Sequence, residues 1–130
     1  MPNEPERIAP ILQYSVLCDA IGQAQNSKLV FVGVFCLLMR PSTMPQMFIA
    51  NAWTYGKGKF RENVRILNPE LAVMVEVPAI EFELKDQALA HINISGVGGL
   101  SFDRVGTYWV EISLDGNRIL AYPLPVLQPS

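Results

Sequence analysis

The chain has 130 residues, of which 50% are hydrophobic and 17% are charged, and its formal net charge is −2. This length suits one domain that buries a hydrophobic core without disulfide or metal cross-links. Nucleic acid is not expected as a partner, because the charge leaves no basic surplus to neutralise phosphates. We predict a single globular domain over residues 1–130.

The first ten residues are expected to form a flexible arm before the domain. Residues 1–10 contain three prolines and two glutamates, but no basic segment leading into an apolar one, which an export signal requires. The longest nearly continuous apolar run, Leu29–Met39, has 11 residues, whereas a membrane helix needs roughly 20. We therefore expect a cytoplasmic protein that does not associate with a membrane.

The first half of the chain is predicted to form strands, because apolar residues recur at every second position or in short runs between turn residues. The run Leu29–Phe35 has no polar face, so its strand is expected to be central and covered on both sides. In the predicted strand Phe60–Leu67, the side chains of Phe60, Val64 and Ile66 are expected to face inward. The predicted strands are Tyr14–Asp19, Lys28–Met39, Met47–Tyr55 and Phe60–Leu67.

The second half continues this pattern after a turn at Asn68-Pro69-Glu70. The segment Leu71–Val77 is either a short strand or one helical turn, and Gly96, Gly98 and Gly99 are expected to form a loop. The Asp115-Gly116-Asn117 turn requires a bulge or an odd-numbered connection if Ile112 and Leu120 are to share a face. The last strand contains two prolines and is therefore placed at a sheet edge. The predicted strands are Ile80–Lys85, Ala88–Ser95, Thr107–Leu114 and Arg118–Val126.

Seven to nine short strands with turns about every ten residues predict an all-β, two-sheet antiparallel β-sandwich, with a small β-barrel as the alternative. The triplet Gly106-Thr107-Tyr108 is similar to the G-x-Y of immunoglobulin-like domains, in which the tyrosine hydroxyl ties its strand to the preceding loop. Val110 stands where immunoglobulin domains have cysteine, so the resemblance implies the sandwich without its inter-sheet disulfide.

Both ends of the chain also resemble a bacterial family of unknown function. The residues that carry this resemblance are Val16-Leu17-Cys18-Asp19-Ala20, Ser27 to Phe35, Gly106 to Ile112, Leu114-Asp115-Gly116 and Pro123-Leu124-Pro125-Val126. These motifs are strands and turns, so the resemblance implies a fold and brings no activity with it.

The two cysteines are expected to be free and buried. If Cys18 and Cys36 lie on consecutive strands that turn near Gln23 and Ala24, they are separated by on the order of 23 Å, whereas a disulfide tolerates Cα separations below about 7 Å. A reducing compartment favours free thiols as well.

No catalytic, metal or cofactor site is predicted. His91 is the sole histidine and alternation places it on the outer face, opposite Glu83 of a neighbouring strand, where the two would form a surface ion pair. Glu81, Glu83 and Glu111 are expected to lie on a solvated sheet face, and the Gly96–Gly99 segment leads into a strand and not into the helix that a phosphate loop needs.

Apolar side chains exceed what one sandwich core can cover. Trp109 falls on the face opposite Tyr108 and Val110, Leu89 points away from the core, and Trp53 and Tyr55 belong to a strand that is apolar on both sides. We therefore expect a non-catalytic interaction or structural module that self-associates or binds a protein partner. The alternative is a small-ligand or carbohydrate-binding module that uses these aromatic residues for stacking.

Overall fold

A computed structural model describes residues 6–129, and within them the chain forms nine β-strands and no helix. None of the described residues forms a helix of the length and apolar character that crossing a membrane would require. The strands are β1 (Ile11–Cys18), β2 (Ala20–Gln23), β3 (Leu29–Val32), β4 (Ser42–Thr54), β5 (Gly58–Leu67), β6 (Val73–Leu84), β7 (Ala90–Phe102), β8 (Gly106–Leu114) and β9 (Asn117–Val126).

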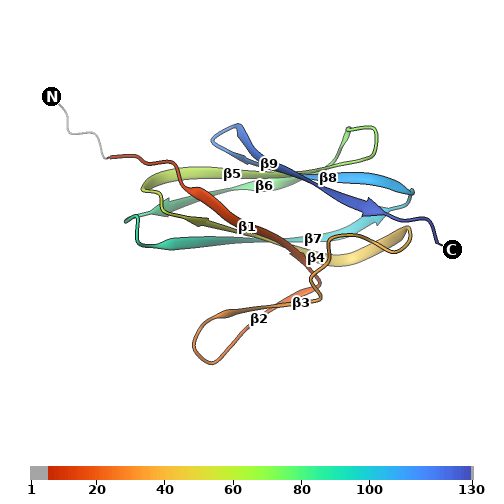
Figure 1. The fold of residues 1–130 in the computed structure, drawn as a ribbon, viewed down its shortest axis with the longest axis horizontal. Coiled ribbons are helices and arrows are strands. Elements are labelled where there is room, and N and C mark those ends of the chain that lie inside the picture. Colours follow the sequence, from red (N-terminus) through yellow and green to blue (C-terminus); the bar gives the residue numbers. More distant parts are fainter. Residues whose placement is uncertain (1–5, 130) are drawn as a thin grey trace.

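The strands build two stacked antiparallel sheets and a separate hairpin (Figure 1). One sheet has the order β1-β4-β7 and the other has the order β6-β5-β8-β9, while β2 pairs only with β3. In immunoglobulin lettering these sheets correspond to A-B-E and C′-C-F-G, with the β2–β3 hairpin inserted between A and B. The expected immunoglobulin-like β-sandwich is therefore confirmed.

The hydrophobic core lies between the two sheets and follows the alternation of β5 and β8. Phe60, Val64 and Ile66 are buried, as predicted, and so are the four inward residues of β8. Because side chains on a strand alternate between its faces, the core residues of β5 and β8 recur at every second position. The inward residues of β8 are Tyr108, Val110, Ile112 and Leu114.

Two local predictions about the C-terminal half are also confirmed. Ile112 pairs with Leu120 but Ser113 pairs with Arg118, so β9 carries one extra residue at a bulge. The Tyr108 hydroxyl accepts a hydrogen bond of 3.3 Å from the Arg104 backbone N–H group, which ties β8 to the loop before it as in immunoglobulin-like domains.

One side of the sandwich is closed by contacts of β9 with β1 and with the segment that precedes β4. The Ser15 and Tyr122 hydroxyl groups are 2.7 Å apart, and Leu38 forms a parallel bridge with Val126. These contacts join the two sheets without backbone pairing between β1 and β9, so the phenol of Tyr122 is a link between layers.

Replacing Tyr122 with phenylalanine is expected to lower the free energy of unfolding by about 1 kcal/mol at neutral pH, because the Ser15 hydroxyl loses its partner. Burial raises the pKa of Tyr122 to about 12, and the hydrogen bond to Ser15 opposes this. The folded state therefore holds the phenolic proton more tightly than the unfolded chain does, so wild-type stability should fall as the pH rises from about 10 through about 12.

Urea denaturation at pH 7 and near pH 11 measures both effects. The variant should lose less stability than the wild type between these two pH values, and exposed Tyr55→Phe should match the wild type at each. Equal losses of stability for the wild type and Tyr122→Phe between these two pH values would contradict the raised pKa of Tyr122.

The apolar run Leu29–Phe35 does not form the central strand, and that prediction is wrong. β3 ends at Val32 and the Phe35 N–H group turns back to donate to the Leu17 carbonyl oxygen at 3.0 Å. β4 is the central strand of its sheet instead. The apolar side chains of the hairpin have another role, since Phe31 packs edge-on against Tyr14 of β1, with ring centroids 6.0 Å apart.

The predictions for the glycine segment, for Leu71–Val77 and for the two cysteines have different outcomes. The glycines at 96, 98 and 99 lie within β7, which is paired with β4, so the predicted loop is wrong. Most of Leu71–Val77 forms the start of β6, which is the strand alternative of that prediction. Both cysteines are free, but only Cys18 is buried and Cys36 is exposed.

Part of the predicted flexible arm packs on the domain. Ile8 pairs with Lys57, and the guanidinium of Arg7 lies 4.5 Å from the centroid of the Phe60 ring. Residues 1–5 lie outside the described part of the chain.

Candidate functional site

A cluster of polar side chains lies inside the sandwich, where a sandwich core is ordinarily apolar. Asn51 and Trp53 of β4 are paired directly with Asn93 and His91 of β7, and all four side chains lie on the inward side of this sheet. Glu62 of β5 comes from the opposite sheet. We call these five residues the Glu62 cluster.

The Glu62 cluster is almost fully withdrawn from solvent. Glu62 and Asn51 are each 1% exposed, and Trp53 and Asn93 are buried. Glu62 Oε1 accepts hydrogen bonds from Trp53 Nε1 at 2.8 Å and from Asn93 Nδ2 at 3.3 Å. Glu62 Oε2 and both polar atoms of the Asn51 carboxamide have no hydrogen-bond partner.

The environment of Glu62 disfavours its charged form. Burial raises the pKa of the Glu62 carboxyl above its ordinary value, while the hydrogen bonds from Trp53 and Asn93 and the nearby His91 lower it. Burial is the largest of these effects, since a low-dielectric interior penalises an ionised carboxylate more than a neutral acid. Glu62 is therefore easier to protonate than an exposed glutamate.

The cluster does not provide a metal site. Within residues 6–129, no three or more histidine, cysteine, aspartate or glutamate side chains are grouped so that they could hold a metal ion. Glu62 brings one carboxylate and His91 one imidazole, and the other members are two carboxamides and an indole N–H donor, so the cluster has two metal-binding groups where a transition-metal site needs at least three.

The structure corrects the predicted position of His91. His91 faces inward and stacks on Phe82, with ring centroids 5.1 Å apart and planes inclined by 16°. Glu83 lies opposite Lys59, not opposite His91. β6 and β7 belong to different sheets, so their connection crosses the sandwich and they do not form the hairpin on which the ion pair depended.

The four aromatic and apolar residues predicted to form an interface or stacking surface lie in three separate places. Trp53 is completely buried, so it offers no surface for a ligand. Tyr55 and Leu89 are exposed just beyond the terminal Thr54–Ala90 pair of β4 and β7. Trp109 is half-buried on the other sheet, paired with Leu67 and Pro123.

The predicted solvated carboxylates also divide into two groups. Glu81 and Glu83 are exposed on β6. Glu111 is buried on the outer side of its sheet, where Arg65 Nη2 approaches its Oε1 to 2.6 Å and Arg118 Nη1 approaches its Oε2 to 3.8 Å. Both oxygens of the Glu111 carboxylate are therefore approached by arginines.

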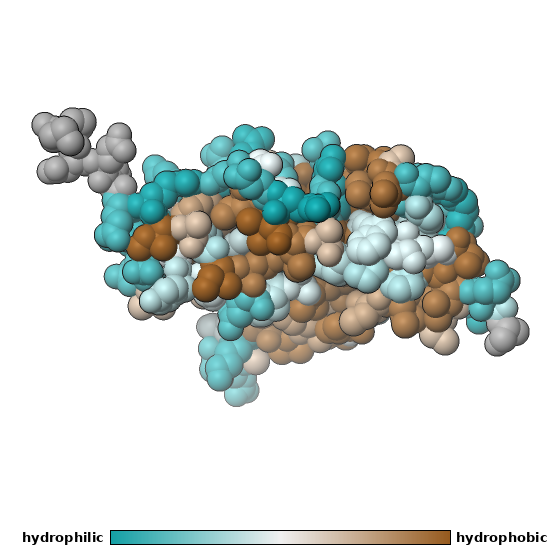
Figure 2. Space-filling view, turned by 45° about the horizontal axis from the view of Figure 1, so that its top comes forward, coloured by the Kyte–Doolittle hydropathy of each residue, from teal (hydrophilic) through white to brown (hydrophobic). Residues whose placement is uncertain are grey.

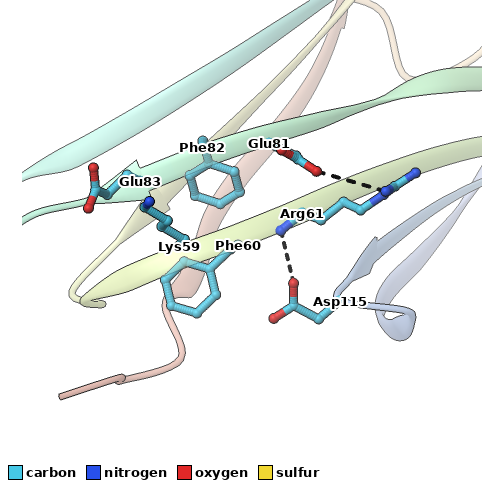
Figure 3. A pocket seen from close by; sticks show the side chains of 7 residues that line it. All are labelled: Lys59, Phe60, Arg61, Glu81, Phe82, Glu83 and Asp115. Carbon is cyan, nitrogen blue, oxygen red and sulfur yellow. Dashed lines mark hydrogen bonds and ion pairs between the residues drawn. The ribbon is translucent and has the colours of Figure 1, made fainter. Parts of the chain in front are cut away.

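A shallow hollow lies over β5 and β6 (Figure 3). Two phenylalanines at its base, Phe60 and Phe82, are only 3% and 6% exposed. Arg61 is engaged twice, through its side chain with Glu81 at 3.9 Å and through its backbone N–H group with Asp115 at 2.9 Å. The hollow therefore offers little apolar surface and few free charges to a ligand.

The outer face of the β1-β4-β7 sheet is apolar. Cross-strand pairing aligns Tyr14 with Ala52 and Ile92, and Val16 with Ala50 and Ile94. The β2–β3 hairpin extends from this side of the sandwich (Figure 1). Ile94 remains 40% exposed.

Hydrophilic residues gather elsewhere on the molecule. Figure 2 shows them along the upper edge of the view and at the tip of the β2–β3 hairpin, whereas hydrophobic residues reach the surface between these regions. The hairpin tip is polar because its turn, residues 23–28, contains glutamines, asparagine, serine and lysine.

β7 is an edge strand without charge. Its 13 residues include no aspartate, glutamate, lysine or arginine, and within the described part of the chain it pairs only with β4. Natural edge strands are usually protected by charges or prolines, because their free backbone groups can pair with another chain. β6 and β9 follow this rule and β7 does not.

These features define an immunoglobulin-like β-sandwich that encloses a polar cluster and has β7 as a long edge strand without acidic or basic residues. The chain belongs to the family of unknown function DUF6941, whose model matches residues 13–127. The match runs from β1 to β9, so the expected family membership is confirmed. None of the curated proteins matches the chain.

The Glu62 cluster was missed by sequence reasoning although a signal for it was present. Glu62 is in phase with Phe60, Val64 and Ile66, so the alternation of β5 already directs its side chain into the core. The prediction for His91 inverts the two faces of β7, because His91 is in phase with the buried Asn93 and Ser95 and all three face inward.

Proposed function

We propose that this protein is a non-catalytic interaction module that pairs with a second copy of itself through the edge and outer face of β7. The observation that carries this proposal is the uncharged edge of β7, 13 residues long, which at about 3.4 Å per residue extends over roughly 44 Å. An antiparallel partner strand would satisfy the free backbone groups along this edge.

A second copy suits this edge electrostatically. Two β7 strands related by a two-fold axis bring together no like charges, because neither strand carries any. In such an arrangement even-numbered residues of one copy pair with even-numbered residues of the other. Ile92 and Ile94 of both copies would therefore lie on one continuous face. That face extends the apolar surface already formed by Val16 and Tyr14.

The other three sheet edges are less suited to pairing. β6 carries Glu76, Glu81 and Glu83 together with Pro78, and β9 carries Arg118 and two prolines. The edge of β1 is occupied in part by the chain itself, since Phe35 bonds to Leu17 and Ser15 bonds to Tyr122. This comparison favours β7 as the docking edge.

The test is the concentration dependence of mass, measured by sedimentation equilibrium or light scattering. Wild-type protein should pass from monomer to dimer as its concentration rises. Ile94→Lys should weaken this association by about tenfold or more, because it places a charge on the apolar face beside the pairing edge.

Ile119→Lys is the matched control. Ile119 is also exposed, at 46%, but lies on β9 of the other sheet, so this variant should dimerise like the wild type. A wild-type protein that stays monomeric at high micromolar concentration, or equal weakening by both substitutions, would refute the proposal.

A further inference from the structure

We propose that Glu62 is a proton-binding site inside the sandwich: in the folded protein it is a neutral carboxylic acid whose proton sits on Oε2 and is donated to the Asn51 carboxamide oxygen. The site joins β5 of one sheet to β4 of the other. This inference concerns the interior of one chain and does not depend on self-association.

The hydrogen bonds around Glu62 are unequally distributed between its two oxygens. Oε1 receives both the indole N–H group of Trp53 and the amide of Asn93, whereas Oε2 receives none. Asn51, also unpartnered, presents a carbonyl oxygen that needs a donor. A protonated Oε2 supplies a donor to that oxygen, whereas an ionised Oε2 could only accept from the Asn51 amide group and would leave the oxygen unpaired.

The residues packed around Glu62 offer little positive charge to support an ionised carboxylate. β4 contributes Asn51 and Trp53, which carry no charge, and the residues paired with Glu62 on its own sheet are Ile80 and Leu114. β7 contributes Asn93 and His91, and among the residues named here His91 alone is able to become positive. None of the ion pairs formed by the described residues involves Glu62.

An ionised Glu62 would thus be a buried charge without a partner, which proteins avoid by taking up a proton. The raised pKa of this carboxyl, caused mainly by burial, agrees with that geometry. When the pH rises, the proton is released to solvent and the carboxylate is left between the sheets.

The direction of the pH effect follows from this. The folded chain holds the Glu62 proton at pH values where the unfolded chain has already lost it. The stabilising contribution is therefore fully present below the ordinary pKa of glutamic acid and is lost as the pH rises through the folded-state value. Stability falls with rising pH, which is opposite to the usual effect of a salt-bridged carboxylate.

Glu62→Gln tests the proposal, because glutamine is neutral at every pH and can place its amide group where the acid places its proton. Urea denaturation of wild type and variant is compared at pH 5 and pH 8, at one fixed protein concentration. The unfolding constant of the wild type should rise several-fold relative to that of Glu62→Gln between these two pH values.

Glu111→Gln is the matched control, because the Glu111 carboxylate is buried as that of Glu62 is but is paired with Arg65. The unfolding constant of this variant should exceed that of the wild type by the same factor at pH 5 and at pH 8.

A direct measurement on the wild type keeps the proposal testable if a variant fails to fold. The carboxyl carbon of Glu62, followed by carbon-13 NMR, should titrate above the ordinary range for glutamic acid. A midpoint at or below that range, or parallel pH profiles for wild type and Glu62→Gln, would overturn the proposal and indicate an ionised carboxylate that is satisfied by bound water.

Discussion

Replacing Trp53 with alanine is expected to lower the free energy of unfolding by about 3–5 kcal/mol. Trp53 is completely buried and stacks on Phe82, with ring centroids 5.9 Å apart. Its removal leaves a cavity between the sheets and withdraws the shorter of the two hydrogen bonds to Glu62 Oε1. Chemical denaturation monitored by far-ultraviolet circular dichroism measures this loss.

Two controls separate packing from hydrogen bonding. Trp53→Phe keeps an aromatic ring but removes the N–H donor, so it should cost less than Trp53→Ala and still about 1–3 kcal/mol. Trp109→Ala alters a half-buried ring on the outer side of the other sheet and should cost less than Trp53→Ala. Equal losses for the two alanine variants would contradict the central position of Trp53.

Replacing Gly56 with alanine is expected to destabilise the fold by about 1–3 kcal/mol through steric overlap. A Cβ atom at this position would lie 2.6 Å from the Pro10 Cβ, 2.7 Å from its Cα and 2.8 Å from its nitrogen. Two of these are backbone atoms, which no side-chain rotation can move. The variant must therefore displace the segment that pairs Ile8 with Lys57.

Gly22→Ala is the control for this prediction. A Cβ atom at Gly22 would meet no atom within 4 Å, so the substitution should leave stability unchanged or raise it slightly. Thermal denaturation of both variants provides the comparison. If Gly56→Ala were as stable as Gly22→Ala, the close packing of Pro10 on Gly56 would be wrong.

Regular alternation is what made the fold predictable. Where every second residue is apolar, as in β5 and β8, both the strand and its buried face were predicted correctly, because the period of two is a direct consequence of strand geometry. The bulge in the last strand was predictable for the same reason, since Ile112 and Leu120 had to share a face.

Polar residues in the interior were not predictable from local hydropathy. Asn93 lies inward because Glu62, from a distant part of the chain, supplies its acceptor. Sequence alone does not show that two such segments meet. The same limit applies to the run from Leu29, whose apolar side chains serve a short hairpin packed on Tyr14 and not the centre of a sheet.

The location of the two tryptophans gives the protein two built-in optical reporters. The indole of Trp53 is hydrogen-bonded to Glu62 in a dry interior, so its emission should be blue-shifted and should respond to the charge on that carboxyl. Trp109 lies half-buried on the other sheet. Keeping one indole at a time, with phenylalanine in place of the other, would let the interior and the outer surface be followed separately in one molecule.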